Sequence, residues 1–231
     1  GNPLPGKKSD AINKYSRRSI PDAKNFEEAI VIAKNMFGSK SRDWSKDFKN
    51  EETLDSYRKE FELMDNYLSP WHPETILDIG TAYAQVPEMF QRKYNSQLYL
   101  LDGDASSNKP NQVRDIGYGE SSNFQFYTNK MKLIEDYDRR GLKYNFIDAQ
   151  RIQIPNINFD LIMSCTSCGF HYPLNTYSNL ISAYSNTQTK IIIDLRKATL
   201  KDQLEKFEIK FEIVDILRDQ GKSVKALIKL Q

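Results

Sequence analysis

The sequence predicts an α/β fold: a three-layer α/β/α sandwich on a mostly parallel seven-stranded sheet, with a C-terminal antiparallel hairpin and an N-terminal helical cap. Five short apolar runs alternate with segments of helical spacing, which is typical of parallel strands joined by crossover helices. Two further β-rich runs, 209–216 and 223–230, flank Asp219-Gln220-Gly221 and predict the hairpin. Apolar residues recur at helical spacing between 21 and 68, which predicts the cap.

Changes of composition divide the chain, whose 231 residues suit one domain with a full core. Residues 1–20 are polar and basic with early prolines, which predicts a loose arm. Residues 21–70 form the predicted cap, which ends where Pro70 disfavours helix. Residues 71–231 form the predicted α/β domain, with a long insertion at 105–142.

Charge and composition exclude several classes of function. The net charge of +2 offers no large basic field, so we expect no nucleic-acid partner. No apolar run approaches the roughly 18 residues that cross a bilayer, and no signal-peptide pattern opens the chain, so we expect no membrane partner. Cys165 and Cys168 make no disulfide framework, which favours the reducing cytoplasm. The sequence predicts no oligomeric state.

The first predicted strand and the turn after it organise the domain. Thr75 to Ile79 is a short apolar run broken only by Asp78, which suits a buried parallel strand. The small residues from Gly80 to Ala84 allow a tight turn and close approach of a ligand to the backbone, and Pro87 predicts a helix start. Strand, turn and helix together favour a nucleotide-type site, although an ordinary βα turn has the same features.

The remaining elements follow from the same rules. Apolar and β-branched runs predict four more strands, and helical spacing predicts the helices between them. The strands are 97–101, 144–147, 159–164 and 190–194, and the helices are 123–140, 175–185 and 199–207. Residues 105–122, rich in Ser, Asn, Pro and Gly, are predicted to form a long loop.

Three consecutive strands carry an acid at their carboxyl ends, namely Asp78, Asp102 and Asp148. Ligands of open α/β sheets bind outside these ends, so we expect the three acids to converge on one crevice. Asp102, about 22 residues beyond Gly80, suits two ribose hydroxyls, and Asp148 with the backbone of Ala149 suits an adenine amine. The alternative is that Asp102 caps the next segment and Asp148 is a turn residue.

The same turn disfavours a nicotinamide dinucleotide. The G-x-G-x-x-G signature of such sites lets a pyrophosphate approach the backbone, whereas only Gly80 is present here. Tyr83 and Gln85 occupy the space that a pyrophosphate would need. A nucleoside ligand without a pyrophosphate fits better.

These segments resemble the class I S-adenosylmethionine-dependent methyltransferases. Asp78-Ile79-Gly80-Thr81-Ala82-Tyr83-Ala84 is similar to the family's D-x-G-x-G-x-G loop, with alanines in place of the second and third glycines. LYLLDGD, NFIDA and FDLIMSCTSCGFHYPLNTY resemble its second, third and fourth strand segments, and the hairpin resembles its reversed last strand. The resemblance covers Thr75 to the C-terminus and points most to small-molecule and sugar O-methyltransferase-like proteins.

The resemblance implies a Rossmann-like fold, S-adenosylmethionine as cofactor with S-adenosylhomocysteine as product, and methyl transfer to a small hydroxylated acceptor such as a sugar. It implies no metal. The cofactor-binding residues that it implies are Asp78, Gly80, Thr81, Ala82, Tyr83, Gln85, Asp102, Gly103, Asp148, Ala149, Ser164 and Cys165.

The segment from Cys165 to Pro173 carries the densest set of reactive side chains in the sequence. A hydroxyl acceptor must lose its proton during methyl transfer, and His171 is the candidate general base. Tyr172 is expected to orient the acceptor, and Phe170 or Tyr83 to face the sulfonium as a cation–π wall. A capping or core-edge histidine is the alternative for His171.

Two further alternatives stay open. Cys165 and Cys168 form a C-x-x-C pair, but it lacks further zinc ligands and leaves a late strand, so we expect two small cysteines beside a pocket. Because the loop lacks two glycines, a nucleoside-binding or scaffold protein that keeps the fold without catalysis is the alternative function.

Overall fold

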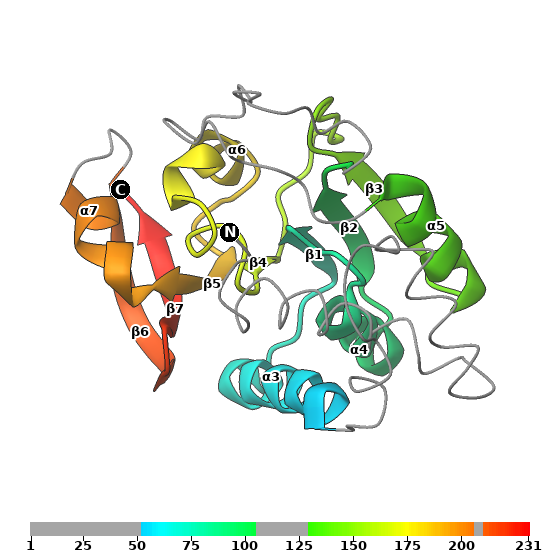
Figure 1. Cartoon of the computed structure of the whole chain (residues 1–231), viewed down its shortest axis with the longest axis horizontal. Helices are drawn as coiled ribbons and strands as arrows, with labels where there is room; N and C mark the ends of the chain where they lie inside the picture. The colour runs from blue at the N-terminus through cyan, green and yellow to red at the C-terminus, as the bar shows by residue number, and fades with distance from the viewer. Residues whose placement is uncertain (1–51, 105–128, 206–209) are drawn as a thin grey trace, which may run out of the picture.

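The computed structural model describes residues 52–104, 129–205 and 210–231. Its seven strands form one sheet in the order β3-β2-β1-β4-β5-β7-β6, as Figure 1 shows. The strands are β1 Thr75–Ile79, β2 Gln97–Asp102, β3 Tyr144–Asp148, β4 Leu161–Ser164, β5 Lys190–Arg196, β6 Phe211–Gln220 and β7 Ser223–Leu230. The helices are α3 Glu52–Leu68, α4 Gln85–Tyr94, α5 Lys130–Arg139, α6 Ser178–Ala183 and α7 Leu200–Glu205, with 3-10 turns η3 Leu174–Thr176 and η4 Lys197–Thr199.

The predicted fold class is confirmed: five strands are parallel and the hairpin of β6 and β7 is antiparallel. β1 pairs with β2 on one side and with β4 on the other. The order of the strands therefore reverses at β1, and the carboxyl ends of β1 and β4 form the switch point at which open α/β sheets bind ligands. The predicted arm at 1–20, the cap before residue 52 and the loop at 105–122 lie outside the described residues.

Some boundaries differ from the predictions. The helix predicted at 175–185 is divided into η3 and α6, and β6 continues further than expected, with register shifts in its pairing with β7. β4 begins only at Leu161. Just before it, the Asp160 carboxylate accepts hydrogen bonds from the N–H groups of Glu74 at 2.8 Å and Thr75 at 3.3 Å. Asp160 thus ties the amino ends of β1 and β4 together.

Helices cover both faces of the sheet. One face packs against α6 and the segments around it, through Leu77, Ile79, Leu101, Ile162, Ile181 and Ile193. The other packs against α3, α4 and α5, through Met64, Ile76, Phe90, Leu100, Leu133 and Met163. Successive strand residues alternate between the two cores, as the pleat requires. None of the described helices is long and apolar enough to cross a membrane.

Arg140, the C-cap residue of α5, joins α5 to α4. Its side chain is 1% exposed and pairs with the carboxylates of Glu88 on α4 and Asp136 on α5, the latter at 3.1 Å. It also donates a hydrogen bond to the carbonyl oxygen of Tyr83, in the turn after β1. A buried cation needs such partners, so this network fixes the β1 turn relative to both helices.

Loss of Arg140 would leave Glu88 and Asp136 without their buried cation. We expect Arg140→Ala to lower the free energy of unfolding by about 3–5 kcal/mol, as removal of one partner from a buried ion pair does. Arg92→Ala is the control, because Arg92 also pairs with Glu88 but is 68% exposed; it should cost less than about 1 kcal/mol. Urea denaturation, monitored by circular dichroism, measures the free energy of unfolding of both variants. Equal small losses of stability in the two would contradict the role of Arg140 in joining the helices.

Candidate functional site

Asp78, Asp102 and Asp148 lie on one face of the sheet at its carboxyl edge. Asp102 is the register partner of Asp148, and Asp78 is the partner of Leu100, two residues before Asp102. Register partners in parallel strands point to the same face, and side chains alternate along a strand. The structure therefore brings the three acids together, on the face that carries α3, α4 and α5.

The Asp102 carboxylate joins the turn after β1 to the end of β2. One oxygen accepts a hydrogen bond from the Ala82 N–H at 2.7 Å, and the other accepts from the Gly103 N–H at 2.7 Å. The N–H groups of Gly80 and Thr81 donate to the Leu101 carbonyl oxygen at 2.8 and 3.0 Å. A carboxylate oxygen can accept more than one hydrogen bond.

The phenol of Tyr137 on α5 holds the same turn from the helical layer. It is fully buried and donates a hydrogen bond to the Ala82 carbonyl oxygen. Burial, and then the charge of Asp102, raise the pKa of Tyr137 well above its usual value, and Asp78 adds to the shift. The phenol therefore stays a donor at neutral pH.

The turn after β1 has a left-handed backbone at three alternate positions. Gly80, Ala82 and Ala84 have φ angles of 73°, 47° and 56°. The two alanines stand where the resembled loop has its second and third glycines, and they take the conformation that glycine adopts most readily. The alanines therefore hold a left-handed backbone at these two positions, at a strain of about 1–2 kcal/mol per alanine.

Gly80 lies directly against the segment that follows β4. A Cβ atom on Gly80 would be 1.8 Å from Ser167 Oγ and 3.4 Å from the Tyr172 hydroxyl oxygen. Those two hydroxyl groups are 2.8 Å apart and share a hydrogen bond. The β1 turn and the β4 segment thus form one surface, and only glycine fits at position 80.

Buried polar groups hold the segment after β4. Ser164 Oγ donates to the Ile79 carbonyl oxygen at 2.6 Å and accepts from the Cys168 N–H at 2.8 Å. Thr166 has a left-handed φ of 49°, which is uncommon for a β-branched residue, and its N–H donates to Asp194 Oδ2 at 2.9 Å. Backbone strain of this kind clusters at binding and catalytic sites.

The two predicted catalytic residues occupy different positions. Tyr172 is half-buried with its hydroxyl beside Gly80, whereas His171 is exposed and its ring meets Phe170 edge-on at 5.1 Å. The Arg196 guanidinium lies 5.5 Å from the centre of the same Phe170 ring. Two aromatic residues were predicted to face the sulfonium. Of these, Phe170 lies beside His171, whereas Tyr83 is fully buried.

Asp148 pairs with Lys130, a residue that the sequence analysis did not predict for the site. Its carboxylate is 3.1 Å from Lys130 Nζ and accepts from the Gln150 N–H at 2.9 Å. The Ala149 N–H donates to the Asp102 carbonyl oxygen at 2.9 Å, so it is already used within the protein. An adenine amine is a hydrogen-bond donor, so the predicted acceptor for it at this edge is the Asp148 carboxylate.

The structure gives the two cysteines different surroundings. Cys168 is fully buried, and burial raises the pKa of its thiol, so it stays protonated. Cys165 is half-buried, with its sulfur 3.7 Å from Lys225 Nζ. Both are free thiols.

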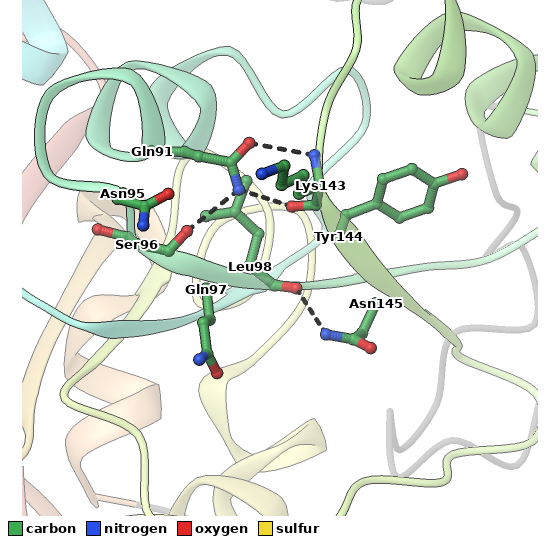
Figure 2. A pocket seen from close by; sticks show the side chains of 8 residues that line it. All are labelled: Gln91, Asn95, Ser96, Gln97, Leu98, Lys143, Tyr144 and Asn145. Atoms are coloured by element: carbon green, nitrogen blue, oxygen red, sulfur yellow. Dashed lines mark hydrogen bonds between the residues drawn. The ribbon is translucent and has the colours of Figure 1, made fainter.

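A pocket of about 290 Å³ lies at the opposite edge of the sheet, near the amino ends of β2 and β3. The Gln91 side chain donates to the carbonyl oxygens of Ser96 at 3.1 Å and Lys143 at 2.6 Å, and it accepts from the Lys143 N–H at 3.1 Å (Figure 2). Gln91 therefore braces the end of α4 against the start of β3. This pocket is remote from the strand-end acids.

The contact between Gly80 and Ser167 predicts a large effect of adding one methyl group. Gly80→Ala should lower the free energy of unfolding by about 2–5 kcal/mol, through overpacking and left-handed strain. Gly221→Ala is the control, because Gly221 has a similar φ of 64° but open space around it, and it should cost only about 1–2 kcal/mol. Ser167→Gly should recover part of the loss in the Gly80→Ala background; thermal denaturation showing no recovery would count against the contact.

Neither a protein-family model nor a curated protein matches this sequence. Among solved structures, the chain is similar to a ribosomal protein L11 methylase from Lactobacillus delbrueckii subsp. bulgaricus, with 14% identity, 78% of this chain and 79% of that chain covered, and a TM-score of 0.45. It is similar to the PH0226 protein from Pyrococcus horikoshii OT3, with 12% identity, 74% and 89% covered, and a TM-score of 0.46. It is also similar to the plantazolicin methyltransferase BpumL in complex with a triazolic desmethylPZN analog and SAH, with 16% identity and a TM-score of 0.43.

The match to BpumL covers 87% of this chain but 64% of that one, so the chain spans less than two thirds of BpumL. The order β3-β2-β1-β4-β5-β7-β6, with five parallel strands and an antiparallel β7, gives the chain a Rossmann-like α/β fold.

Proposed function

We propose that the protein transfers a methyl group from S-adenosylmethionine to a small hydroxylated acceptor. One observation carries the proposal: Asp102, at the carboxyl end of β2, is bonded to the turn after β1 and shares a face with Asp78 and Asp148. These strand ends adjoin the switch point between β1 and β4, beside which open α/β sheets bind their ligands.

The residues at this edge fit an adenosyl group. Asp102 would accept from the two ribose hydroxyls, each bond to a carboxylate contributing about 1.5–3 kcal/mol. Asp148 would accept from the adenine amine. The left-handed Ala82 and Ala84 give the turn the path of a glycine loop, which supports binding despite the missing glycines.

The cofactor supplies an electrophilic methyl group for in-line displacement, and the protein supplies position and a base. Tyr172, with its hydroxyl beside Gly80, orients the acceptor hydroxyl. His171, exposed one residue earlier, accepts the proton, since imidazole titrates near neutral pH. Cofactor and acceptor would then meet where the β1 turn touches the β4 segment.

Asp102→Ala should weaken binding of S-adenosylhomocysteine at least about tenfold, because a charged acceptor is lost. Asp160→Ala is the matched control: Asp160 also accepts from two backbone N–H groups, but at the amino end of the sheet. Its affinity should stay near that of the wild type. Isothermal titration calorimetry measures all three proteins, and a wild type that binds nothing at millimolar ligand would overturn the proposal.

His171→Ala should keep S-adenosylhomocysteine affinity and lose about 10²–10⁴-fold in turnover, the usual contribution of a general base. Turnover is measured as methyl incorporation into a panel of sugars and other small hydroxylated compounds. Normal turnover by the variant would exclude the base role. A wild type that binds the cofactor and methylates nothing in the panel would favour the alternative of a nucleoside-binding scaffold.

A further inference from the structure

Four charged side chains from four elements meet beside the β4 segment, and we call them the Asp194 cluster: Glu60 of α3, Asp194 of β5, Arg218 of β6 and Lys225 of β7. Lys225 Nζ lies 3.0 Å from Asp194 Oδ1 and 3.3 Å from Glu60 Oε2. Arg218 pairs with Glu60 and lies 3.5 Å from Asp194 Oδ1. Lys225 is fully buried and Asp194 is 2% exposed.

Stability alone does not account for the Asp194 cluster. Replacing a buried ion pair by apolar residues of similar volume is often neutral or stabilising, because burying charge is unfavourable. Burial works to lower the pKa of Lys225, but the charge of Asp194, the Cys165 sulfur and the hydrogen bond to Asp194 outweigh it. The pKa of Lys225 is therefore raised, and the ammonium stays charged at neutral pH.

The second oxygen of Asp194 leads from the cluster to the site. While Oδ1 faces Lys225, Oδ2 accepts the hydrogen bond from the Thr166 N–H at 2.9 Å. Thr166 is the residue with the strained left-handed backbone, and Ser167, which follows it, is the residue that packs on Gly80. A contiguous chain of contacts thus runs from the Asp194 cluster to the turn after β1.

We propose that Asp194 is a positioning residue for the active site. The cations fix its carboxylate, and the carboxylate holds Thr166 in its strained conformation, so that Ser167 and Tyr172 keep their places against Gly80. The functional consequence of this positioning rests on the methyl-transfer proposal above, because Ser167, Tyr172 and Gly80 lie where the cofactor and the acceptor are proposed to meet. Asp194 touches neither ligand in this scheme and acts through Thr166.

Two double variants isolate the hydrogen bond from the ion pair. Asp194→Asn with Lys225→Met removes both charges and keeps an oxygen that can accept from Thr166. Asp194→Leu with Lys225→Met removes the same charges, and leucine has nearly the shape of asparagine but no acceptor. Glu60 and Arg218 still pair with each other in both. Circular dichroism establishes that each variant is folded.

The readouts are S-adenosylhomocysteine affinity by calorimetry and hydrogen exchange of the backbone amides of 164–172. We expect the Asn/Met variant to stay within about threefold of the wild type in affinity, and the Leu/Met variant to lose at least about tenfold, with faster exchange in this segment. The proposal would be overturned if both variants kept the affinity and the exchange rates of the wild type. So would equal losses, because the ion pair and not the hydrogen bond would then matter.

The wild-type amide provides a test that needs no variant. We expect the Thr166 N–H to exchange about a hundredfold more slowly than an unprotected amide in an NMR measurement. Exchange at the unprotected rate would overturn the positioning role, even if the Leu/Met variant did not fold. Amide exchange needs no cofactor, so a wild type that fails to bind S-adenosylhomocysteine counts against the methyl-transfer proposal and not against this one.

Discussion

The hydrogen bond from the Ala82 N–H to the Asp102 carboxylate is the interaction on which the rest of the site depends. It fixes the turn after β1 to the end of β2, and Tyr137 holds the carbonyl group of the same residue from the helical layer. Both backbone polar groups of Ala82, its N–H and its carbonyl oxygen, are thus hydrogen-bonded. With the turn fixed in this way, the position of Gly80 against Ser167 is determined, and so is the surface shared by the β1 and β4 segments.

Backbone strain at this edge is matched by buried polar contacts. Ala82, Ala84 and Thr166 all have a left-handed conformation, which costs of the order of 1–3 kcal/mol for a residue other than glycine and persists only where the surroundings hold it. Tyr137 and Asp102 hold Ala82, and Asp194 holds Thr166. Arg140 binds the carbonyl oxygen just before Ala84. Asp102, Asp194 and Arg140 therefore have a common structural role, which is to keep a strained edge in place.

Much of the sheet could be predicted because its signals are local. The apolar run from Thr75 to Ile79 is a strand by composition alone, and an acid at a strand end lies at the carboxyl edge whatever the helices do. The same rule would have found Asp194, which ends the predicted strand 190–194.

The buried cations could not be predicted from local signals in the sequence. Lys225 and Lys229 occupy equivalent places in the alternation of β7, yet only Lys225 is buried, because only it meets Asp194 and Glu60 from distant elements. The left-handed alanines were equally hidden, since small residues predict a tight turn but not the sign of φ.

A structure of the protein crystallised with S-adenosylhomocysteine tests the central claim most directly. If carboxylates of neighbouring strands form an adenosine site on the turn after β1, the ribose hydroxyls will lie within hydrogen-bond distance of Asp102, with the adenine amine beside Asp148. A ligand bound elsewhere, such as in the pocket beside Gln91, or a ribose that does not contact Asp102, would contradict the account.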